Sequence, residues 1–456
     1  MTTKPVSVRI SSSDWASLRS HLFTEDGNEN AAALLCGITN SEIAQRLLVR
    51  RILPVPSTEY RDRNSYHLEV APSFYNRLVD ESLRENLHPI IVHSHPFSGH
   101  ARYSVSDDYG ENRLLPVLQS LLPGRVVASL LLSQNSVTGR TVNNGKFMPL
   151  DSLTVVGQRM QILPFAGPLN TREVPERYDR QVRAFGIEGQ RILDRLKVAI
   201  VGVGGTGSIV AEQLVRAGIK NFVLIDPDRI ETSNVTRLFG SDAASIGREK
   251  VKVVATHLND LGANRVQTVV DTAIRQPILM LLKDADVIFS CVDNDRSRSI
   301  LNRFAYQYLI PVVDVGVRLD GRSGDIQRAA GRVSVVGNSM LCLRCSGHLN
   351  SDRIRAESLP SDERRRLERE GYVMGIDEPV PSVVSLNTTV AGLAVTAAFN
   401  LFLNLTGGLQ PLNQLYDATE GVVFVVREEH ETGCDICDEN KGAKGRGDLQ
   451  VVSAYD

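Results

Sequence analysis

The chain has 456 residues, of which 42% are hydrophobic and 23% charged, and its formal net charge is -2. This length predicts two or three globular domains, and the near-neutral charge argues against nucleic acid or an anionic membrane as a partner. The amino terminus has no signal-peptide pattern and six cysteines are too few for a secreted disulfide scaffold, so we expect a cytoplasmic protein.

The first part of the chain alternates between helix and strand patterns. Residues 11–23 predict a capped amphipathic helix, and the apolar run 31–37 predicts a buried strand. A helix over 73–87 and a strand over 89–92 follow. We therefore expect an α/β domain with a central mixed sheet over residues 1–160.

The strand over 89–92 leads into the sequence HSHP. His93 and His95 are separated by one residue, so both imidazoles project to one face and can ligate one metal ion. The loop that follows can return Asp107 as an oxygen ligand. Three protein ligands leave a position for water, which is typical of a catalytic zinc. Scattered surface histidines are the alternative for any single H-x-H pair.

The whole spacing, H-x-H-P, seven residues and then S-x-x-D, resembles the signature of JAMM (JAB/MPN) zinc isopeptidases. The resemblance implies three zinc ligands: His93, His95 and Asp107. It also implies that Ser104 stabilises the oxyanion and that Glu29 is the general base. The spacing from Glu29 to Gly37 is one residue longer than the family pattern, so either a bulge absorbs the extra residue or the base is displaced.

After an expected linker over residues 161–175, an apolar strand at 198–203 enters a glycine-rich loop. The loop glycines are Gly202, Gly204, Gly205 and Gly207. A helix pattern and a second apolar run follow, and the run ends at Asp226, which is placed to accept hydrogen bonds from a ribose. This strand–loop–helix–strand order predicts a Rossmann-like nucleotide site.

The residues after this second run favour a triphosphate over a nicotinamide dinucleotide. Asp228, Asn234 and Arg237 follow within a few residues, and such a cluster suits phosphates and their metal. An oxidoreductase is therefore an unfavoured alternative.

Three motifs between residues 176 and 437 resemble the ThiF/MoeB/ubiquitin-activating family: R-Y-x-R-Q, G-x-G-G-x-G and D-x-D-x-I-x-x-S-N-x-x-R. The resemblance implies a mostly parallel sheet over residues 176–440 and adenylation of the C-terminal glycine of a ubiquitin-like protein, with ATP and Mg²⁺. It implies a ribose ligand at Asp226, phosphate ligands at Asn234, Arg237 and Lys250, a magnesium ligand at Asp293, and a homodimer in which Arg180 reaches the neighbouring nucleotide. Arg298 is interpreted as a solvated surface residue.

Two C-x-x-C pairs predict a structural zinc site. The pairs are Cys342 with Cys345 and Cys434 with Cys437, and four thiolates can close one tetrahedral site. A redox role would need a thioredoxin-like setting, which the sequence does not indicate.

The region between these pairs contains no cysteine, although residues 351–374 resemble the crossover loop of the family. Cys36 and Cys291 are interpreted as packed small hydrophobes. We therefore expect that the acyl-adenylate passes to an external thiol, on a conjugating enzyme or a sulfur donor. The apolar stretch 383–405 contains too many polar groups for lipid and predicts a buried helix, and residues 441–456 are expected to form a tail.

The sequence thus predicts a zinc isopeptidase fused to an adenylating enzyme, both acting on one modifier in a prokaryotic ubiquitin-like conjugation pathway. One alternative is activation of a sulfur carrier for thiocarboxylate-based biosynthesis. Another is that one domain is degenerate and serves as a binding scaffold.

Overall fold

The computed structural model describes residues 4–449 except 98, 144, 166–172, 274, 323–324, 361, 365, 367–380, 404, 406, 408–410, 428 and 440. The chain forms two compact units. The first comprises Met1–Leu169 together with Lys444–Val451, and the second is built from Asn170–Ala443. The expected boundary at residue 160 lies inside the first unit, where residues 161–164 of the expected linker form a strand. Residues 166–172 of that linker, and residues 361, 365 and 367–374 of the expected crossover loop, lie outside the described residues.

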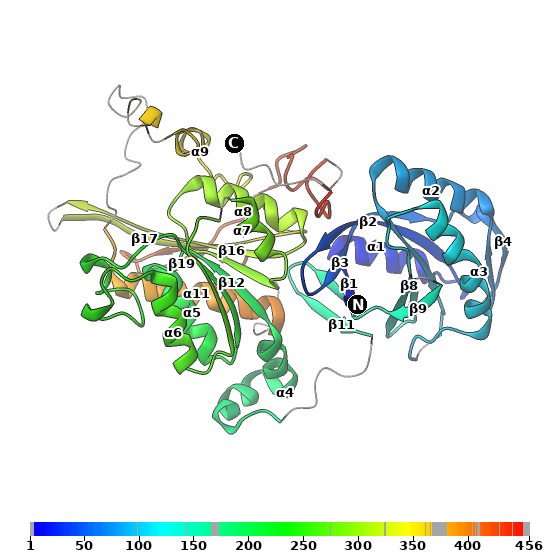
Figure 1. Cartoon of the computed structure of the whole chain (residues 1–456), viewed down its shortest axis with the longest axis horizontal. Coiled ribbons are helices and arrows are strands. Elements are labelled where there is room, and N and C mark those ends of the chain that lie inside the picture. The colour runs from blue at the N-terminus through cyan, green and yellow to red at the C-terminus, as the bar shows by residue number, and fades with distance from the viewer. Residues whose placement is uncertain are drawn as a thin grey trace. The chain divides into compact units, whose positions relative to one another are not determined.

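The first unit is built on a nine-stranded mixed sheet with the order β11-β10-β1-β3-β2-β6-β7-β8-β9 (Figure 1). Its strands are β1 Val6–Ser11, β2 Ala31–Asn40, β3 Gln45–Pro54, β6 His88–Ser94, β7 Ala128–Leu132, β8 Val137–Asn143, β9 Lys146–Pro149, β10 Ser152–Val156 and β11 Gln161–Pro164. A separate hairpin is formed by β4 Tyr60–Arg63 and β5 Leu68–Val70. The α/β prediction with a mixed sheet is confirmed.

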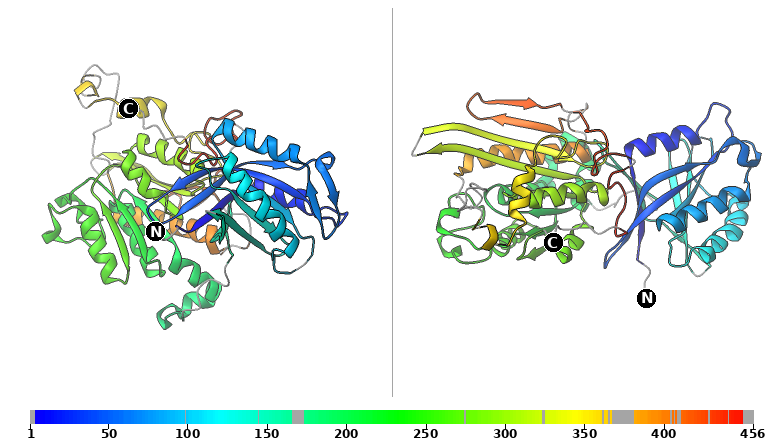
Figure 2. Two further views of the ribbon diagram at one scale, coloured as in Figure 1. Left: turned by 45° about the vertical axis from the view of Figure 1, so that its right-hand side comes forward. Right: turned by 90° about the horizontal axis from the view of Figure 1, so that it is seen from above.

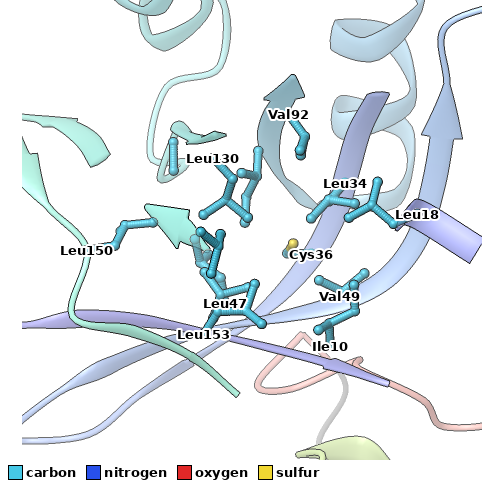
Figure 3. Packing of buried hydrophobic residues seen from close by; sticks show 14 of the residues in the cluster. Ile10, Leu18, Leu34, Cys36, Leu47, Val49, Val92, Leu130, Leu150 and Leu153 are labelled. Atoms are coloured by element: carbon cyan, nitrogen blue, oxygen red, sulfur yellow. The ribbon is translucent and has the colours of Figure 1, made fainter. Parts of the chain in front are cut away.

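Alternation along β2 creates two cores, one on each face of this sheet. Leu34 and Cys36 join the larger core, which also receives residues of α1 Ser12–Leu22 (Figure 3). Leu35 points to the opposite face, where it packs with residues of α2 Pro72–Glu85. Cys36 is fully buried, as expected for a packed hydrophobe.

The second unit contains an eight-stranded sheet with the order β14-β13-β12-β15-β16-β17-β18-β19. Its strands are β12 Lys197–Val201, β13 Asn221–Ile225, β14 Arg265–Val269, β15 Val287–Ser290, β16 Val312–Arg322, β17 Asp325–Val336, β18 Asn413–Asp417 and β19 Val422–Val425. The first five strands in space run parallel and the last three pair antiparallel. The β16–β17 hairpin extends as a long ribbon in Figure 2.

Helices cover both faces of this second sheet (Figure 1). The helices of this unit are α4 Asp179–Arg195, α5 Gly205–Arg216, α6 Lys250–Asp260, α7 Gln276–Leu282, α8 Asp295–Gln307, α9 Ser351–Glu357 and α11 Val384–Leu403. The chain winds from β12 to β14 on one side and returns to β15 on the other. The strand order therefore reverses between β12 and β15, and ligands of doubly wound sheets bind outside the strand ends at such a point.

Helix α11 is the one helix among the described residues that is long and apolar enough to span a membrane by length and composition. Of its most apolar window, 61% is buried inside the protein. The helix packs against α5, β16 and β17, which agrees with the predicted buried helix.

The segment that starts at Lys444 packs on the first unit, although the sequence indicated only a tail. The backbone N–H of Asp448 donates to the carbonyl of Ile38, and Gly447 pairs with Ile38 in a parallel bridge. Lys444 is buried and its Nζ lies 3.0 Å from Oδ2 of Asp14. The segment therefore covers the edge of β2 beyond the start of β6.

Candidate functional site

Three metal-binding side chains converge at the carboxyl end of β6 and the first turn of α3 Val105–Leu121. Nε2 of His93 lies 3.1 Å from Oδ1 of Asp107, and Nε2 of His95 lies 3.3 Å from Oδ2. One ligand atom from each residue lies within 4.8 Å of the others. Nε2 of His93 is buried and lacks a well-aligned hydrogen bond, which fits a nitrogen arranged for a metal ion.

The segment before β2 brings Glu29 to this cluster. Its Oε1 lies 3.6 Å from Nε2 of His95, and the side chain is buried. Its backbone N–H donates to the carbonyl of Asn64 between β4 and β5. The pairing of β2 with β6 contains no inserted residue. In the pairing of β2 with β3 the register shifts by one residue, and the inserted residue is Arg50 of β3. Glu29 therefore reaches the cluster without a bulge in β2.

Ser104 is the N-cap of α3 and orients Asp107. Its Oγ accepts the N–H of Asp107, while its own backbone N–H donates to Oδ2 of Asp107 at 2.6 Å. This capping box fixes the carboxylate between the two histidines. Within the part of the chain that the structure describes, the Ser104 hydroxyl only accepts a hydrogen bond, so its hydrogen can be donated to a bound group.

The ionisation of the cluster follows from burial and from its charge pairing. Burial raises the pKa of Glu29, which suits a group that accepts a proton near neutral pH. Burial also disfavours charge on His93 and Asp107, but the attraction between the two groups outweighs it, raising the pKa of His93 and lowering that of Asp107. This pairing favours the charged form of each.

Sequence reasoning missed a buried ion pair under this cluster. Oε2 of Glu111 accepts hydrogen bonds from Arg140 Nε at 2.7 Å and from Ser129 Oγ at 2.8 Å. The Arg140 guanidinium lies over the ring of Tyr103 at 3.8 Å and the ring of Phe147 at 4.1 Å. Arg140 comes from β8, a strand without a recognisable motif, so only the three-dimensional structure reveals this support.

In the second unit, the loop between β12 and α5 is shaped by its glycines. Gly202 has a φ of 85°, a conformation that favours glycine. A Cβ on Gly207 would overlap the carbonyl oxygen of Gly202, whereas a Cβ on Gly204 would meet no atom within 4 Å. A Cβ on Gly205 would lie 3.0 Å from Cδ of Arg237. The loop thus keeps backbone exposed at the start of α5, where helix N–H groups attract phosphate.

Asp226 follows β13 and is tied to this loop. Its Oδ2 accepts the N–H of Val203 at 2.6 Å and its Oδ1 accepts the N–H of Asp228 at 2.9 Å. Burial raises its pKa. Lys250 Nζ lies 2.7 Å from Oδ2 of Asp228, so the two groups expected near the phosphates form an ion pair.

The other residues predicted to bind the nucleotide differ from one another in their hydrogen bonds and in their exposure to solvent. Arg237 donates to the carbonyl of Ser233 and packs on Gly205, and Asn234 accepts the N–H of Glu231. Asp293 is exposed, three residues after the end of β15. Arg180 is exposed on α4, and among the described residues no hydrogen bond or ion pair joins it to the loop.

Arg298 is not the solvated residue that the sequence suggested. Its side chain is 15% exposed, and its guanidinium contacts Asp295, Asp314 and the carbonyl of Val292. The buried Asp314 carboxylate also contacts Arg332. The prediction was wrong because Asp314 lies on β16, which brings its charge next to α8 only in the folded sheet.

Asn387 of α11 is a second residue that the sequence did not indicate. It is 2% exposed, and its Nδ2 lies 2.6 Å from the place of a Cβ on Gly205. A side chain on Gly205 would therefore displace this amide. The apolar pattern around Asn387 gave no reason to assign it to the nucleotide loop.

The four cysteines of the two C-x-x-C pairs meet in the second unit: Cys342, Cys345, Cys434 and Cys437. Their sulfur atoms lie within 4.8 Å of one another. The hydrogen bond from Cys437 and the backbone N–H of Cys345 lower the pKa of Cys342 to about 5. Burial raises the pKa of Cys345 to about 12, and the hydrogen bond to Cys342 raises the pKa of Cys437. The convergence of the four sulfur atoms fits a tetrahedral structural zinc.

The doubly wound sheet, the glycine loop and the carboxylate after β13 define a nucleotide-binding α/β protein. The profile of the ThiF family matches residues 178–437, more than half of the chain, and the chain therefore belongs to the ThiF family.

Relatives with known names match parts of the chain. The molybdopterin-synthase adenylyltransferase of Escherichia coli K12 is 31% identical over 150 residues, covering 32% of this chain and 60% of its own length. The ubiquitin-like modifier-activating enzyme 5 of Drosophila mojavensis is 31% identical over 231 residues, covering 47% and 52%. The chain thus spans between half and two thirds of the length of these relatives. Among solved structures, E. coli MccB with MccA-N7isoASN has a TM-score of 0.48 at 17% identity, covering 58% of this chain and 76% of that one.

Proposed function

We propose that the second unit uses ATP to adenylate the C-terminal glycine of a ubiquitin-like or sulfur-carrier protein. The observation that carries this proposal is the membership of residues 178–437 in the ThiF family. The backbone-lined loop supports it, because Asp226 is held at the loop by two N–H groups and can receive a ribose. In this reaction the glycine carboxylate attacks the α-phosphate and pyrophosphate leaves.

The charged residues near the loop supply the electrostatics of this step. Arg237 and Lys250 would stabilise negative charge that develops on the phosphates, and Asp293 would hold Mg²⁺. The pairing of Lys250 with Asp228 keeps its ammonium close to the loop before ATP arrives. Arg180 is proposed to act on the nucleotide of a second copy in a homodimer.

The acyl group is then transferred from the adenylate to an external thiol, and AMP leaves. Burial raises the pKa of Cys36 and of Cys291 well above that of an ordinary thiol, so neither is a ready nucleophile. The other four cysteines form the cluster proposed to hold the structural zinc. A conjugating enzyme and a sulfur donor are both compatible acceptors, and sulfur-carrier chemistry is the alternative to conjugation.

Pyrophosphate exchange tests the adenylation. Exchange should require a small protein that ends in glycine, and Asp293→Ala should reduce it about 100-fold because magnesium binding is lost. Asp325→Ala removes an exposed carboxylate at the β16–β17 hairpin and serves as the control. Unchanged exchange in Asp293→Ala would refute the magnesium assignment.

We further propose that the first unit is a zinc-dependent amide hydrolase of the JAMM type, which processes or removes the same modifier. The convergence of His93, His95 and Asp107 supports this proposal. Zinc held there supplies Lewis acidity and a water of lowered pKa. Oε1 of Glu29 accepts a proton during attack on the amide and returns it to the leaving amine, while Ser104 donates to the oxyanion.

Two variants separate these roles. Glu29→Gln should lower cleavage of a tagged modifier by about 100-fold or more with zinc content unchanged, because only proton transfer is lost. His95→Ala should remove one zinc per chain and abolish cleavage. Cys434→Ser is the matched control, since it should remove the other zinc and leave the first site loaded. Cleavage that survives both Glu29→Gln and His95→Ala would contradict the hydrolase assignment.

A further inference from the structure

The first unit contains a cavity of about 270 Å³ beside the metal cluster. Glu29, His93 and Asp107 form one side of it. The remaining walls come from β2, the end of β3, α2, α3, β6 and the β4–β5 hairpin. Their apolar residues are Val55, Leu68, Val70, Phe74, Ile91 and Leu114. A space of this kind, open to the reacting groups, can hold part of a substrate.

The size of the cavity matters for a substrate that has glycine at the cleaved bond. A cavity of ~150 Å³ in a protein core holds a benzene molecule. The space beside His93 is larger, so it accommodates the whole side chain of leucine, methionine or phenylalanine. Glycine would leave this apolar space unfilled.

The charged residues that line the cavity further restrict which substrate side chains it can hold. Four carboxylates line the cavity: Glu29, Glu69, Asp107 and Glu111. The two imidazoles that line it belong to His67 and His93. An acidic side chain would lose hydration there and meet these carboxylates, which disfavours it.

Two aromatic rings extend the apolar surface outward. Tyr66 lines the cavity and is 76% exposed, and its ring stacks on Phe97 with centroids 5.0 Å apart. Phe97 follows the His93–Pro96 motif directly in sequence. An extended peptide that approaches the metal cluster therefore meets apolar surface before it reaches the cavity.

We propose that this cavity is a specificity pocket for a large apolar side chain on the leaving side of the cleaved amide bond, because the modifier supplies its C-terminal glycine on the acyl side. The proposal rests on the hydrolase function proposed above and adds its substrate preference. The hydrolase would favour aromatic, leucine or methionine side chains at that position over glycine, and it would reject acidic ones.

Gly110 offers a direct way to fill the pocket. It lines the cavity from within α3, and a Cβ added there meets no atom within 4 Å. A phenylalanine at this position can therefore occupy the cavity without a clash at its Cβ. Gly392 of α11, in the second unit, also has open space around its Cβ and gives a matched control.

The test uses the full zinc-loaded chain and two series of blocked peptides. Each series varies one residue that flanks the cleaved amide through Gly, Leu, Phe and Glu. Because one methylene in an apolar pocket changes kcat/KM about 10-fold or more, Phe and Leu should exceed Gly by at least that factor in the series that varies the leaving-side residue. Gly110→Phe should reduce this ratio at least tenfold with zinc content unchanged, and Gly392→Phe should not change it.

A binding measurement separates the two proposals. Calorimetry with the Glu29→Gln protein should show tighter binding of the Phe peptide than of the Gly peptide. Such preferential binding without cleavage by the unaltered chain would refute the hydrolase and support the pocket. Equal cleavage of all peptides by the unaltered chain and by Gly110→Phe would overturn the pocket and leave the hydrolase intact.

Discussion

The candidate site of the first unit consists of side chains that pair with one another, whereas that of the second unit is built largely from main chain. His93, His95 and Asp107 are oriented by mutual contacts, over the buried pair of Glu111 and Arg140. In the second unit, glycines bring backbone to the surface and the key carboxylate bonds to backbone N–H groups. The first site should therefore be sensitive to lost charges and the second to added methyl groups.

Arg140→Ala gives the largest expected effect on stability. It leaves Glu111 buried without its charge partner, which should lower the free energy of unfolding of the first unit by about 3–5 kcal/mol. Hydrogen exchange resolved by peptide measures each unit separately. Adding Glu111→Gln should recover part of the loss, and a double variant as unstable as Arg140→Ala would show that packing on Tyr103 and Phe147 matters more than charge.

Acid should weaken the first unit through His88 at the start of β6. Burial lowers its pKa to about 4, and its Nδ1 accepts the N–H of Val126, which requires the neutral ring. Between pH 6.5 and 4, the His88 ring binds a proton in the unfolded chain but stays neutral in the folded protein. Stability should therefore fall with falling pH over this window, by up to about 3 kcal/mol.

His88→Gln should flatten this dependence, measured by hydrogen exchange in the first unit at several pH values. Burial also lowers the pKa of His348 in the second unit to about 4, so that unit should keep its own acid sensitivity in the variant. An unchanged slope in the first unit of His88→Gln would count against the role of His88.

Gly207→Ala tests the site that is built from main chain. The added methyl group overlaps the carbonyl oxygen of Gly202, so we expect a loss of about 1–3 kcal/mol in stability and loss of ATP binding. Gly204→Ala has open space and should stay within about 0.5 kcal/mol of the original chain. Thermal unfolding and ATP calorimetry would show whether the two variants differ.

Lys250→Ala should have the smallest effect on stability. Its partner Asp228 is 61% exposed, and such pairs contribute under about 1 kcal/mol. ATP affinity should nevertheless fall, since the phosphates lose a cation. A stability loss comparable with that of Arg140→Ala would mean that the second site depends on a side-chain charge pair as strongly as the first.

Local motifs predicted most of the fold and the two clusters of metal-binding side chains that the fold brings together. The strands and helices around β2, α2 and β6 could be recognised in the sequence, because burial of one face gives hydrophobic residues a period of two in strands and of 3.6 in helices. The glycine loop and the cysteine pairs could be recognised because their chemistry requires short, fixed spacings between residues in the sequence.

Residues that act through distant strands could not be predicted. Arg140 and Glu111 are 29 residues apart, and no pattern links them before β8 lies near α3. Arg298 was misjudged for the same reason, since Asp314 reaches it through the sheet. The proximity of Asn387 to the glycine loop could not be predicted, because Asn387 lies in an apolar helix whose position depends on tertiary packing.

The segment from Lys444 gives the chain the topology of a domain insertion, because residues 170–443 interrupt the first unit. During synthesis the ribosome must complete this insert before the segment can emerge. At ~5–20 residues per second this delay is on the order of tens of seconds. Throughout that time the end of β2 lacks its final partner, and an uncovered strand edge can pair with other chains. The nascent chain is therefore most exposed to misassembly while the inserted unit is being made.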